Sequence, residues 1–380
     1  MQFAAVAGQQ ALKRNWISMV ESGSLPHALL LSGKEGTGGL PLAIAFAQYL
    51  FCEKKTVSDS CGQCPSCRKI AKLAHPDLHF SFPAVAPKPG VKPLSRHFME
   101  SFREFFLQSP YGSTYDWLQF IKAENKQGNI PAEECREIIE RLSFKSFEGG
   151  YKVQIIWRPE YLGREGNILL KLIEEPPADT LILLVAEEPE DIIATILSRT
   201  QLLQLVPLST TEITEALMSG NQIDIQKASQ IAHLSDGSYT QALQLMRNHS
   251  SDLLTPLREW VQAVFNNNLI AVHHWVEDMA KQGREQQKNS LVYLQQLLAH
   301  AIRMILIPGY QPALPEDELA FLRSFCAKGI SPKTCELFIK SIAKAVYHIE
   351  RNAHSKTQLM QLSVQMQYHL KERELKAFPS

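Results

Sequence analysis

The sequence predicts an α/β domain built on a parallel sheet, followed by a part that is entirely helical. Three short apolar runs, 28–31, 153–157 and 181–186, alternate with helical segments in the first half of the chain. Continuous apolar runs of this length are typical of parallel strands that are buried on both faces, with helices on either side of the sheet. Beyond about residue 207 no comparable run recurs, so the remainder is expected to consist of helices.

The first strand leads into a glycine-rich stretch, residues 32–40, which reads SGKEGTGGL. Gly33, Gly36 and Gly38 have the spacing of a phosphate-binding loop, and a helical run follows, which is the context such a loop requires. In a working loop the next residues are Lys, which meets the β- and γ-phosphates, and Ser or Thr, which holds Mg²⁺. Here they are Gly39 and Leu40. Taken alone, the stretch is either a degenerate nucleotide loop or an unrelated glycine-rich turn.

Four cysteines follow the helix with the spacing C-x8-C-x2-C-x2-C: Cys52, Cys61, Cys64 and Cys67. Four thiolates can close a tetrahedral Zn²⁺ site that leaves no position for water, so the spacing predicts a structural zinc. An iron–sulfur cluster and free reactive thiols are the alternatives. His75 and His79 lie nearby and are further possible ligands.

Residues 84–128 form a long insertion that is rich in aromatic residues and also carries basic ones. Interleaved aromatic and basic side chains can stack on single-stranded nucleic acid. The interpretation we favour is an inserted helix pair that packs its aromatic rings onto the domain, because insertions in surface loops are tolerated well.

The helical part divides into two expected domains. Ser209 and Glu212 form a capping box that starts a helix, and a small helical domain is expected over 208–252. A second helical domain is expected over 253–380, interrupted at 307–317 by a segment rich in proline and glycine.

Composition excludes several classes of protein. The 380 residues contain 39 Lys and Arg and 39 Asp and Glu, so the formal net charge is zero. A basic footprint for DNA is therefore absent from the chain as a whole. The N-terminus lacks the pattern of a secretory signal, and no apolar run is long enough to cross a membrane. A cytoplasmic protein without a membrane partner is expected.

Three stretches together resemble one family. Residues 167–201, NILLKLIEEPPADTLILLVAEEPEDIIATILSRTQ, are similar to the segment N-x-L-L-K-x-L-E-E-P-P…I-x-S-R-C of bacterial clamp-loader ATPases. With LPHALLLSG at 25–33 and the four cysteines, the chain is identified as resembling the delta-prime family of DNA polymerase III clamp-loader subunits. The resemblance implies a RecA-like AAA+ domain over 1–207 with a zinc module at 52–67, a helical lid over 208–252 and a collar domain over 253–380.

The resemblance also implies that this chain does not hydrolyse ATP. It departs from the motor subunits of the family wherever they grip the nucleotide: at Gly39 and Leu40 in the loop, at Arg158, Pro159 and Glu160 where acids follow a strand, at Ala186 and Glu187 where a polar sensor is expected, and at Thr240 where a lid arginine is common. The rival interpretation is an active motor that binds ATP unconventionally, through Lys34.

One functional motif of the family survives, at Ser198 and Arg199, although Thr200 replaces its cysteine. In the family this motif presents an arginine finger to ATP on the adjacent subunit. The alternative for Arg199 is a salt bridge to a local acid such as Glu187 or Glu188. The implied partners are the gamma or tau motor subunits, the delta subunit and, indirectly, the sliding clamp and primer–template DNA. A zinc-containing DNA-binding module is the remaining alternative.

Overall fold

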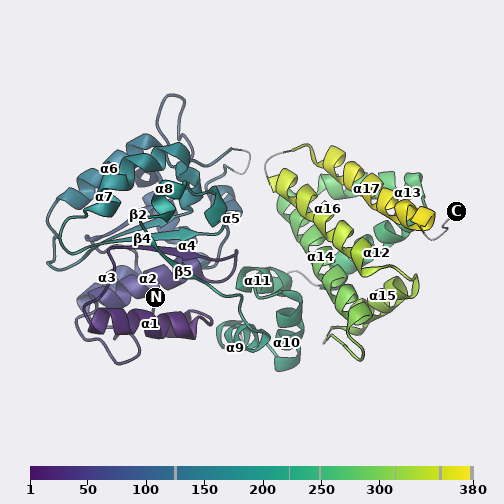
Figure 1. The fold of residues 1–380 in the computed structure, drawn as a ribbon, viewed down its shortest axis with the longest axis horizontal. Helices are drawn as coiled ribbons and strands as arrows, with labels where there is room; N and C mark the ends of the chain where they lie inside the picture. The colour runs from purple at the N-terminus through teal and green to yellow at the C-terminus, as the bar shows by residue number, and fades with distance from the viewer. Residues whose placement is uncertain (124–125, 222, 248–249, 313, 351–352, 377–380) are drawn as a thin grey trace. The chain divides into compact units, whose positions relative to one another are not determined.

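The computed structural model describes residues 1–123, 126–221, 223–247, 250–312, 314–350 and 353–376. The chain divides into two compact units (Figure 1). The first contains residues 1–213 together with 237–240, and the second contains 214–236 and 241–380. None of the helices in the described ranges is long and apolar enough to span a membrane.

The first unit is built on a parallel sheet with the strand order β2-β3-β4-β1-β5. Its strands are β1 (Ala28–Ser32), β2 (Leu78–Ser81), β3 (Lys152–Trp157), β4 (Thr180–Ala186) and β5 (Gln201–Gln204). The predicted strands β1, β3 and β4 are confirmed and form the centre of the sheet. The sequence analysis missed β2 and β5, because both are four-residue edge strands and β5 is largely exposed.

The register of the strands determines where a site can form. Ser32 at the end of β1 pairs with Ala186 at the end of β4, and Trp157 at the end of β3 pairs with Val185. The carboxyl ends of these strands therefore meet at one edge of the sheet, where ligands bind in open α/β folds. The loop 33–38 leaves β1 at this edge.

Helices cover both faces of the sheet (Figure 1). The helices of the first unit are α1 (Gln10–Glu21), α2 (Gly39–Phe51), α3 (Pro65–Ala71), α4 (Met99–Gln108), α5 (Thr114–Phe120), α6 (Ala132–Ser143), α7 (Leu170–Glu174) and α8 (Ala194–Leu197). Short 3₁₀ helices are η1 (Phe3–Ala5), η2 (Ser95–Phe98), η3 (Pro159–Leu169) and η4 (Pro189–Asp191).

Alternate residues of each central strand enter two separate cores. Leu29 and Leu31 pack on one face with α1, α2 and the insertion, where Trp16 stacks on Phe46 at 4.1 Å. Leu30 packs on the other face with α6, η3 and α8. The three-layer α/β/α arrangement predicted from the buried strands is thus confirmed.

The insertion at 84–128 contains α4 and α5, and it forms part of the first core. Phe102, Phe105 and Trp117 are at most 3% exposed, and Phe82 stacks on Phe102 at 4.0 Å. The Trp117 indole N–H donates to the Pro83 carbonyl at 2.7 Å. These rings are not available to stack on bases, and the predicted helix pair is confirmed.

The second unit is helical throughout its described residues. It begins within α9 (Thr210–Asn221), whose predicted capping box between Ser209 and Glu212 is present, with the Glu212 N–H donating to Ser209 Oγ at 3.2 Å. The following helices are α10 (Ile225–Leu234), α11 (Tyr239–Arg247), α12 (Ser250–Phe265), α13 (Leu269–Lys281), α14 (Arg284–Leu306), α15 (Glu316–Ala327), α16 (Pro332–Glu350) and α17 (Ser355–Lys376). The division into a lid and a collar stays a prediction.

Candidate functional site: a filled phosphate loop and a four-cysteine cluster

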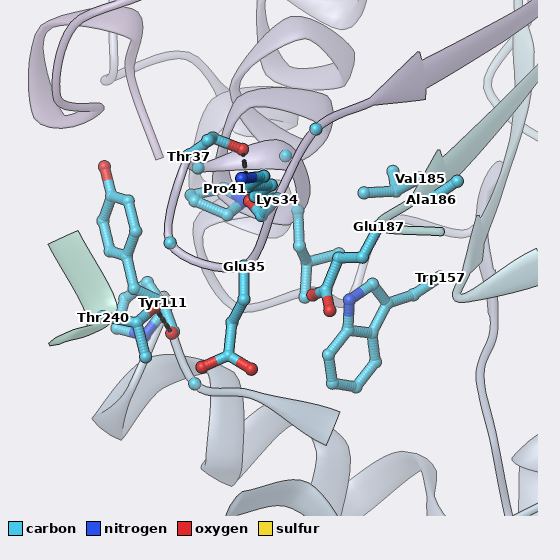
Figure 2. Close-up of a pocket in the computed structure, with 17 residues that line it drawn as sticks. Lys34, Glu35, Thr37, Pro41, Tyr111, Trp157, Val185, Ala186, Glu187 and Thr240 are labelled. Carbon is cyan, nitrogen blue, oxygen red and sulfur yellow. Dashed lines mark hydrogen bonds between the residues drawn. The ribbon is translucent and has the colours of Figure 1, made fainter. Parts of the chain in front are cut away.

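The glycine-rich loop lines a very small pocket at the carboxyl edge of the sheet (Figure 2). The pocket has a volume of about 30 Å³, which holds at most about two water molecules. Ligand pockets of nucleotide size measure roughly 300–1,000 Å³. The loop therefore has the spacing of a phosphate cradle but little open space beside it.

Residues from elsewhere in the first unit fill this space. The Tyr239 N–H donates to the Gly36 carbonyl at 3.0 Å, and the Thr240 hydroxyl donates to the Tyr111 carbonyl at 2.5 Å. The Tyr111 hydroxyl accepts a hydrogen bond from the Ala7 N–H at 2.8 Å, and its ring meets that of Tyr239 edge to face at 4.7 Å. In Figure 2, Tyr111 and Thr240 lie beside the loop.

The glycines of the loop are explained by this packing. Gly36 has φ +86°, and a Cβ there would lie 2.8 Å from Ser238 Cβ and 2.9 Å from Ser238 Cα. Gly38 has φ +89° and lies under the Tyr111 ring, 3.2 Å from the position of an added Cβ. Such close approach needs glycine whether or not a phosphate is bound.

The two positions that would grip the nucleotide are also closed. A Cβ on Gly39 would lie 2.8 Å from Val185 Cγ1, so a lysine fits there only if the Val185 side chain or its strand moves. Leu40 is 5% exposed and belongs to the core. Lys34, Glu35 and Glu187 line the pocket.

An internal ion pair occupies the ends of β3 and β4, where an active P-loop enzyme keeps its metal-binding acids. Arg158, whose side chain is 9% exposed, pairs through Nη1 with the Glu187 carboxylate. Glu160 accepts hydrogen bonds from the N–H groups of Glu187 and Glu188 at 2.6 and 2.8 Å, and burial raises its pKa. The acids at this edge are therefore committed to the protein itself. The pairing of Arg158 with Glu187 was not predicted.

Arg199 lies between α8 and β5, and its side chain is 35% exposed. Its Nε donates to the carboxylate of Glu174, and its Nη1 donates to the Thr195 carbonyl at 3.0 Å and to Ser198 Oγ at 3.1 Å. The local acid is therefore Glu174, at the end of α7, and naming Glu187 or Glu188 as that partner was wrong because Glu187 is held by Arg158. An exposed pair of this kind contributes about 0–1 kcal/mol to stability.

The four cysteines meet in one cluster. The sulfurs of Cys52, Cys61, Cys64 and Cys67 all lie within 4.8 Å of one another. A tetrahedral zinc with Zn–S bonds of ~2.3 Å separates its sulfurs by roughly 3.8 Å, and Cys61 Sγ lies 3.9 Å from Cys67 Sγ. This donor set therefore fits a closed zinc site, and the cysteines would hold the ion for its structural effect alone.

Backbone N–H groups point at these sulfurs, as thiolate ligands require. The Cys61 N–H donates to Cys52 Sγ at 3.2 Å, and the Cys64 N–H donates to Cys61 Sγ at 3.3 Å. Hydrogen bonds from the Gln63 and Cys64 N–H groups lower the pKa of the Cys61 thiol to about 6, whereas burial raises the pKa of Cys67. The cluster forms in the described residues without either of the two nearby histidines.

Those histidines have other surroundings. His75 is buried against the ring of Phe51, and its Nε2 lies 3.2 Å from a Glu148 carboxylate oxygen. The pKa of His79 is lowered to about 4, mainly by burial and secondly by the positive charge of Arg141.

The comparison with known proteins identifies the family. A family profile described as "DNA polymerase III, delta subunit" matches residues 8–209, which is more than half of the chain. The chain belongs to this family. The match covers the glycine-rich loop, the four cysteines and Arg199.

Curated relatives of the family carry two kinds of name. The chain is 28% identical to DNA polymerase III subunit delta' of Bacillus subtilis, over 60% of this chain and 56% of that protein. It is 28% identical to subunit delta' of Escherichia coli, over 50% and 46% of the two chains. It is 26% identical to subunit tau/gamma of Haemophilus influenzae, over 57% and 25%. The chain spans about half the length of the delta' relatives.

Solved structures give only a distant likeness. A gamma subunit-related DNA polymerase III protein of Thermotoga maritima is 14% identical over 94% of this chain and 99% of its own, with a TM-score of 0.37. The RuvB Holliday junction branch migration motor of the same organism is 14% identical over 86% and 84%, with a TM-score of 0.38.

Two residues that pack against the glycine-rich loop, Tyr111 and Ser238, were missed by the sequence analysis. Tyr111 was counted only as one aromatic residue of the insertion, and nothing in the local pattern indicates that it reaches the loop. Thr240 was noted as the replacement of an arginine, and its hydrogen bond to Tyr111 was not foreseen.

Proposed function

We propose that this chain is a subunit of the DNA polymerase III clamp loader that does not hydrolyse ATP itself. In this role it offers Arg199 to ATP bound on a neighbouring motor subunit while the sliding clamp is loaded onto primed DNA in the cytoplasm. The observation that carries the proposal is the filled phosphate loop, with its pocket of about 30 Å³.

The same observation argues against an active motor. Phosphoryl transfer requires groups that position the phosphates and a metal ion that neutralises the developing charge. Here the lysine position is Gly39, packed on Val185, and the acidic edge is tied up by Arg158. A route through Lys34 would need the segment 237–240 and Tyr111 to leave the loop, at the loss of their hydrogen bonds.

Arg199 suits a finger that acts on a neighbour. Its guanidinium lies at the surface, and the pair with Glu174 is partly exposed at both ends. Breaking the pair between Arg199 and Glu174 therefore costs about 1 kcal/mol or less. A γ-phosphate would give the guanidinium a stronger, bidentate partner than the carboxylate. The hydrogen bond from Nη1 to Ser198 Oγ keeps the guanidinium oriented.

The other components of the proposal are structural. The four cysteines would hold zinc, which joins α2 to α3, and the helices of the second unit would supply the collar that meets the motor subunits and the delta subunit. Zero net charge argues against an independent DNA-binding module, since DNA affinity depends mainly on neutralising phosphates. In this proposal the chain would contact DNA and the clamp only within the assembled clamp loader.

The test is the ATPase rate of a loader reconstituted from this chain and its motor subunits, stimulated by clamp and primed DNA. Arg199→Ala is compared with wild type, and gel filtration checks that the complex assembles. An arginine finger contributes about 10³–10⁵ to the rate at its own site, so the turnover of the adjoining site is expected to disappear.

Two further variants separate a finger from an ion pair. Glu174→Ala removes the partner of Arg199 and should leave the rate at the wild-type value or above. Arg164→Ala removes another exposed arginine of the same unit and serves as the matched control. If Arg199→Ala assembles and hydrolyses ATP at the wild-type rate, the proposed role of Arg199 is wrong.

A further inference from the structure

A second cavity lies beside the edge strand β2. It is formed by β2 and the residues that lead into it, by η2, by α4 and by α6, and its volume is about 480 Å³. We call it the amino-edge groove, because it includes the residues that lead into the start of β2. Its charged lining residues are Arg96, Arg103, Arg141 and Glu137, with His75 and His79 beside them. Nothing in the proposed ATP chemistry uses this groove.

The groove carries an excess of positive charge. Arg96 and Arg141 share one carboxylate, that of Glu137, at 3.0 and 3.8 Å. The Nε of Arg103 donates to the Leu73 carbonyl at 2.9 Å, which orients its guanidinium, and no hydrogen bond among the described residues uses its Nη atoms. His79 is neutral at pH 7 because its pKa lies at about 4. Three guanidinium groups thus face a single carboxylate.

Two exposed phenylalanines lie in the loop that follows α6. This loop, residues 144–150, begins three residues after Arg141 of the groove, and Phe144 and Phe147 are 63% and 83% exposed. Lys145 between them is also exposed. Exposed apolar patches rimmed by polar residues mark interaction sites, and aromatic residues and Arg are enriched at protein interfaces.

Hydrogen bonds anchor the backbone of this loop. The Asp77 carboxylate accepts hydrogen bonds from the N–H groups of Phe147 and Glu148 at 2.6 and 2.9 Å, and the Lys152 ammonium donates to the Phe144 carbonyl at 2.8 Å. Glu148 pairs with Lys69 of α3. A loop anchored at both ends loses little entropy when a partner binds to its rings.

We propose that the amino-edge groove and Phe144 and Phe147 bind a short acidic segment of a partner protein. In this arrangement one or two carboxylates of the segment pair with Arg96, Arg103 and Arg141, and an apolar side chain packs on the phenyl rings. The volume of the groove fits a segment of a few residues.

The charges around the groove favour a peptide over a nucleic acid. Helix α6 carries Glu133 and Glu140 at its surface, and α4 carries Glu100 and Glu104. A continuous phosphate backbone would meet these carboxylates on either side of the arginines. A single acidic side chain can pair with the guanidinium groups between them.

The experiment uses the full chain and a displayed library of random heptapeptides. Selection on wild type is followed by counter-selection on the double variant Arg96→Gln with Arg141→Gln. The expected result is enrichment of peptides that combine Asp or Glu with an aromatic or aliphatic residue. A labelled peptide of the enriched sequence is then titrated by fluorescence anisotropy, beside labelled oligo(dT).

The arginine double variant and the double variant Phe144→Ser with Phe147→Ser should each weaken the peptide at least about tenfold, as loss of a central contact does. Arg136→Gln, which changes an exposed arginine of α6 outside the groove, should bind as wild type does. The proposal is overturned if no peptide is enriched after counter-selection, if the variants bind as tightly as wild type, or if oligo(dT) binds the groove more tightly than the peptide.

Discussion

Gly36 offers a direct test of whether the glycine-rich loop is an open cradle or a packed part of the protein. We expect Gly36→Ala to destabilise the first unit strongly. The residue has φ +86°, where a side chain costs about 1–2 kcal/mol. The added Cβ would also lie 2.8 Å from Ser238 Cβ and 2.9 Å from Ser238 Cα, and overpacking of this kind costs typically about 1–3 kcal/mol. The sum is a loss of about 2–5 kcal/mol in the free energy of unfolding.

Gly90→Ala is the matched control, because Gly90 has φ +82° and no atom within 4 Å of an added Cβ. It carries the backbone cost alone, so the difference between the two variants measures the packing of Ser238 on the loop. Adding Ser238→Gly to Gly36→Ala should recover part of the loss, whereas Ser238→Gly added to Gly90→Ala should recover none.

The assay is hydrogen exchange of peptides from β1 and α2, which report the opening of the first unit. Hydrogen exchange is preferred to a single melting curve because the chain contains two units, which need not unfold together. If Gly36→Ala and Gly90→Ala lose the same stability within about 0.5 kcal/mol, the loop is open, and the argument that it is filled by the protein is refuted.

Three further predictions concern metal, nucleotide and pH. The chain as purified should carry one Zn²⁺, measured by mass spectrometry of the metal, and Cys64→Ser should lose it. The same variant should expose η1, because Asp59 of the cysteine segment accepts hydrogen bonds from the Phe3 and Ala4 N–H groups. A fluorescent ATP analogue with Mg²⁺ should not bind the isolated chain at up to about 1 mM, equivalent to about −4 kcal/mol; saturable binding that Lys34→Ala abolishes would favour the active motor instead. Burial lowers the pKa of Lys13 from 10.5 to about 8. Between pH 8 and 10.5 the unfolded state therefore binds more protons than the folded state. The free energy of unfolding should rise over this range, by at most about 3 kcal/mol. Lys13→Met should remove this rise, and an unchanged pH profile in that variant would exclude Lys13 as its cause.

Local patterns were sufficient wherever neighbouring residues in the sequence carry the feature. The strands β1, β3 and β4 are continuous apolar runs, and burial on both faces leaves such runs few other structures. The four cysteines lie within 16 residues, so the chain between them can bring the sulfurs together with little help from the rest of the fold. The sequence itself shows that Gly39 stands where a lysine is expected and Leu40 where a hydroxyl side chain is expected.

The tertiary structure alone decided which residues pack against the glycine-rich loop. Thr240 and Tyr111 are 129 residues apart, and their hydrogen bond depends on how the insertion folds over the sheet. The same holds for the ion pairs of Arg158 with Glu187 and of Arg199 with Glu174. An arginine has several acids within reach of its long side chain, and the backbone positions of the whole sheet determine which one it meets. The sequence therefore determined that the loop lacks the lysine and the hydroxyl of a nucleotide-binding loop, and the packing of distant residues determined which side chains lie against it.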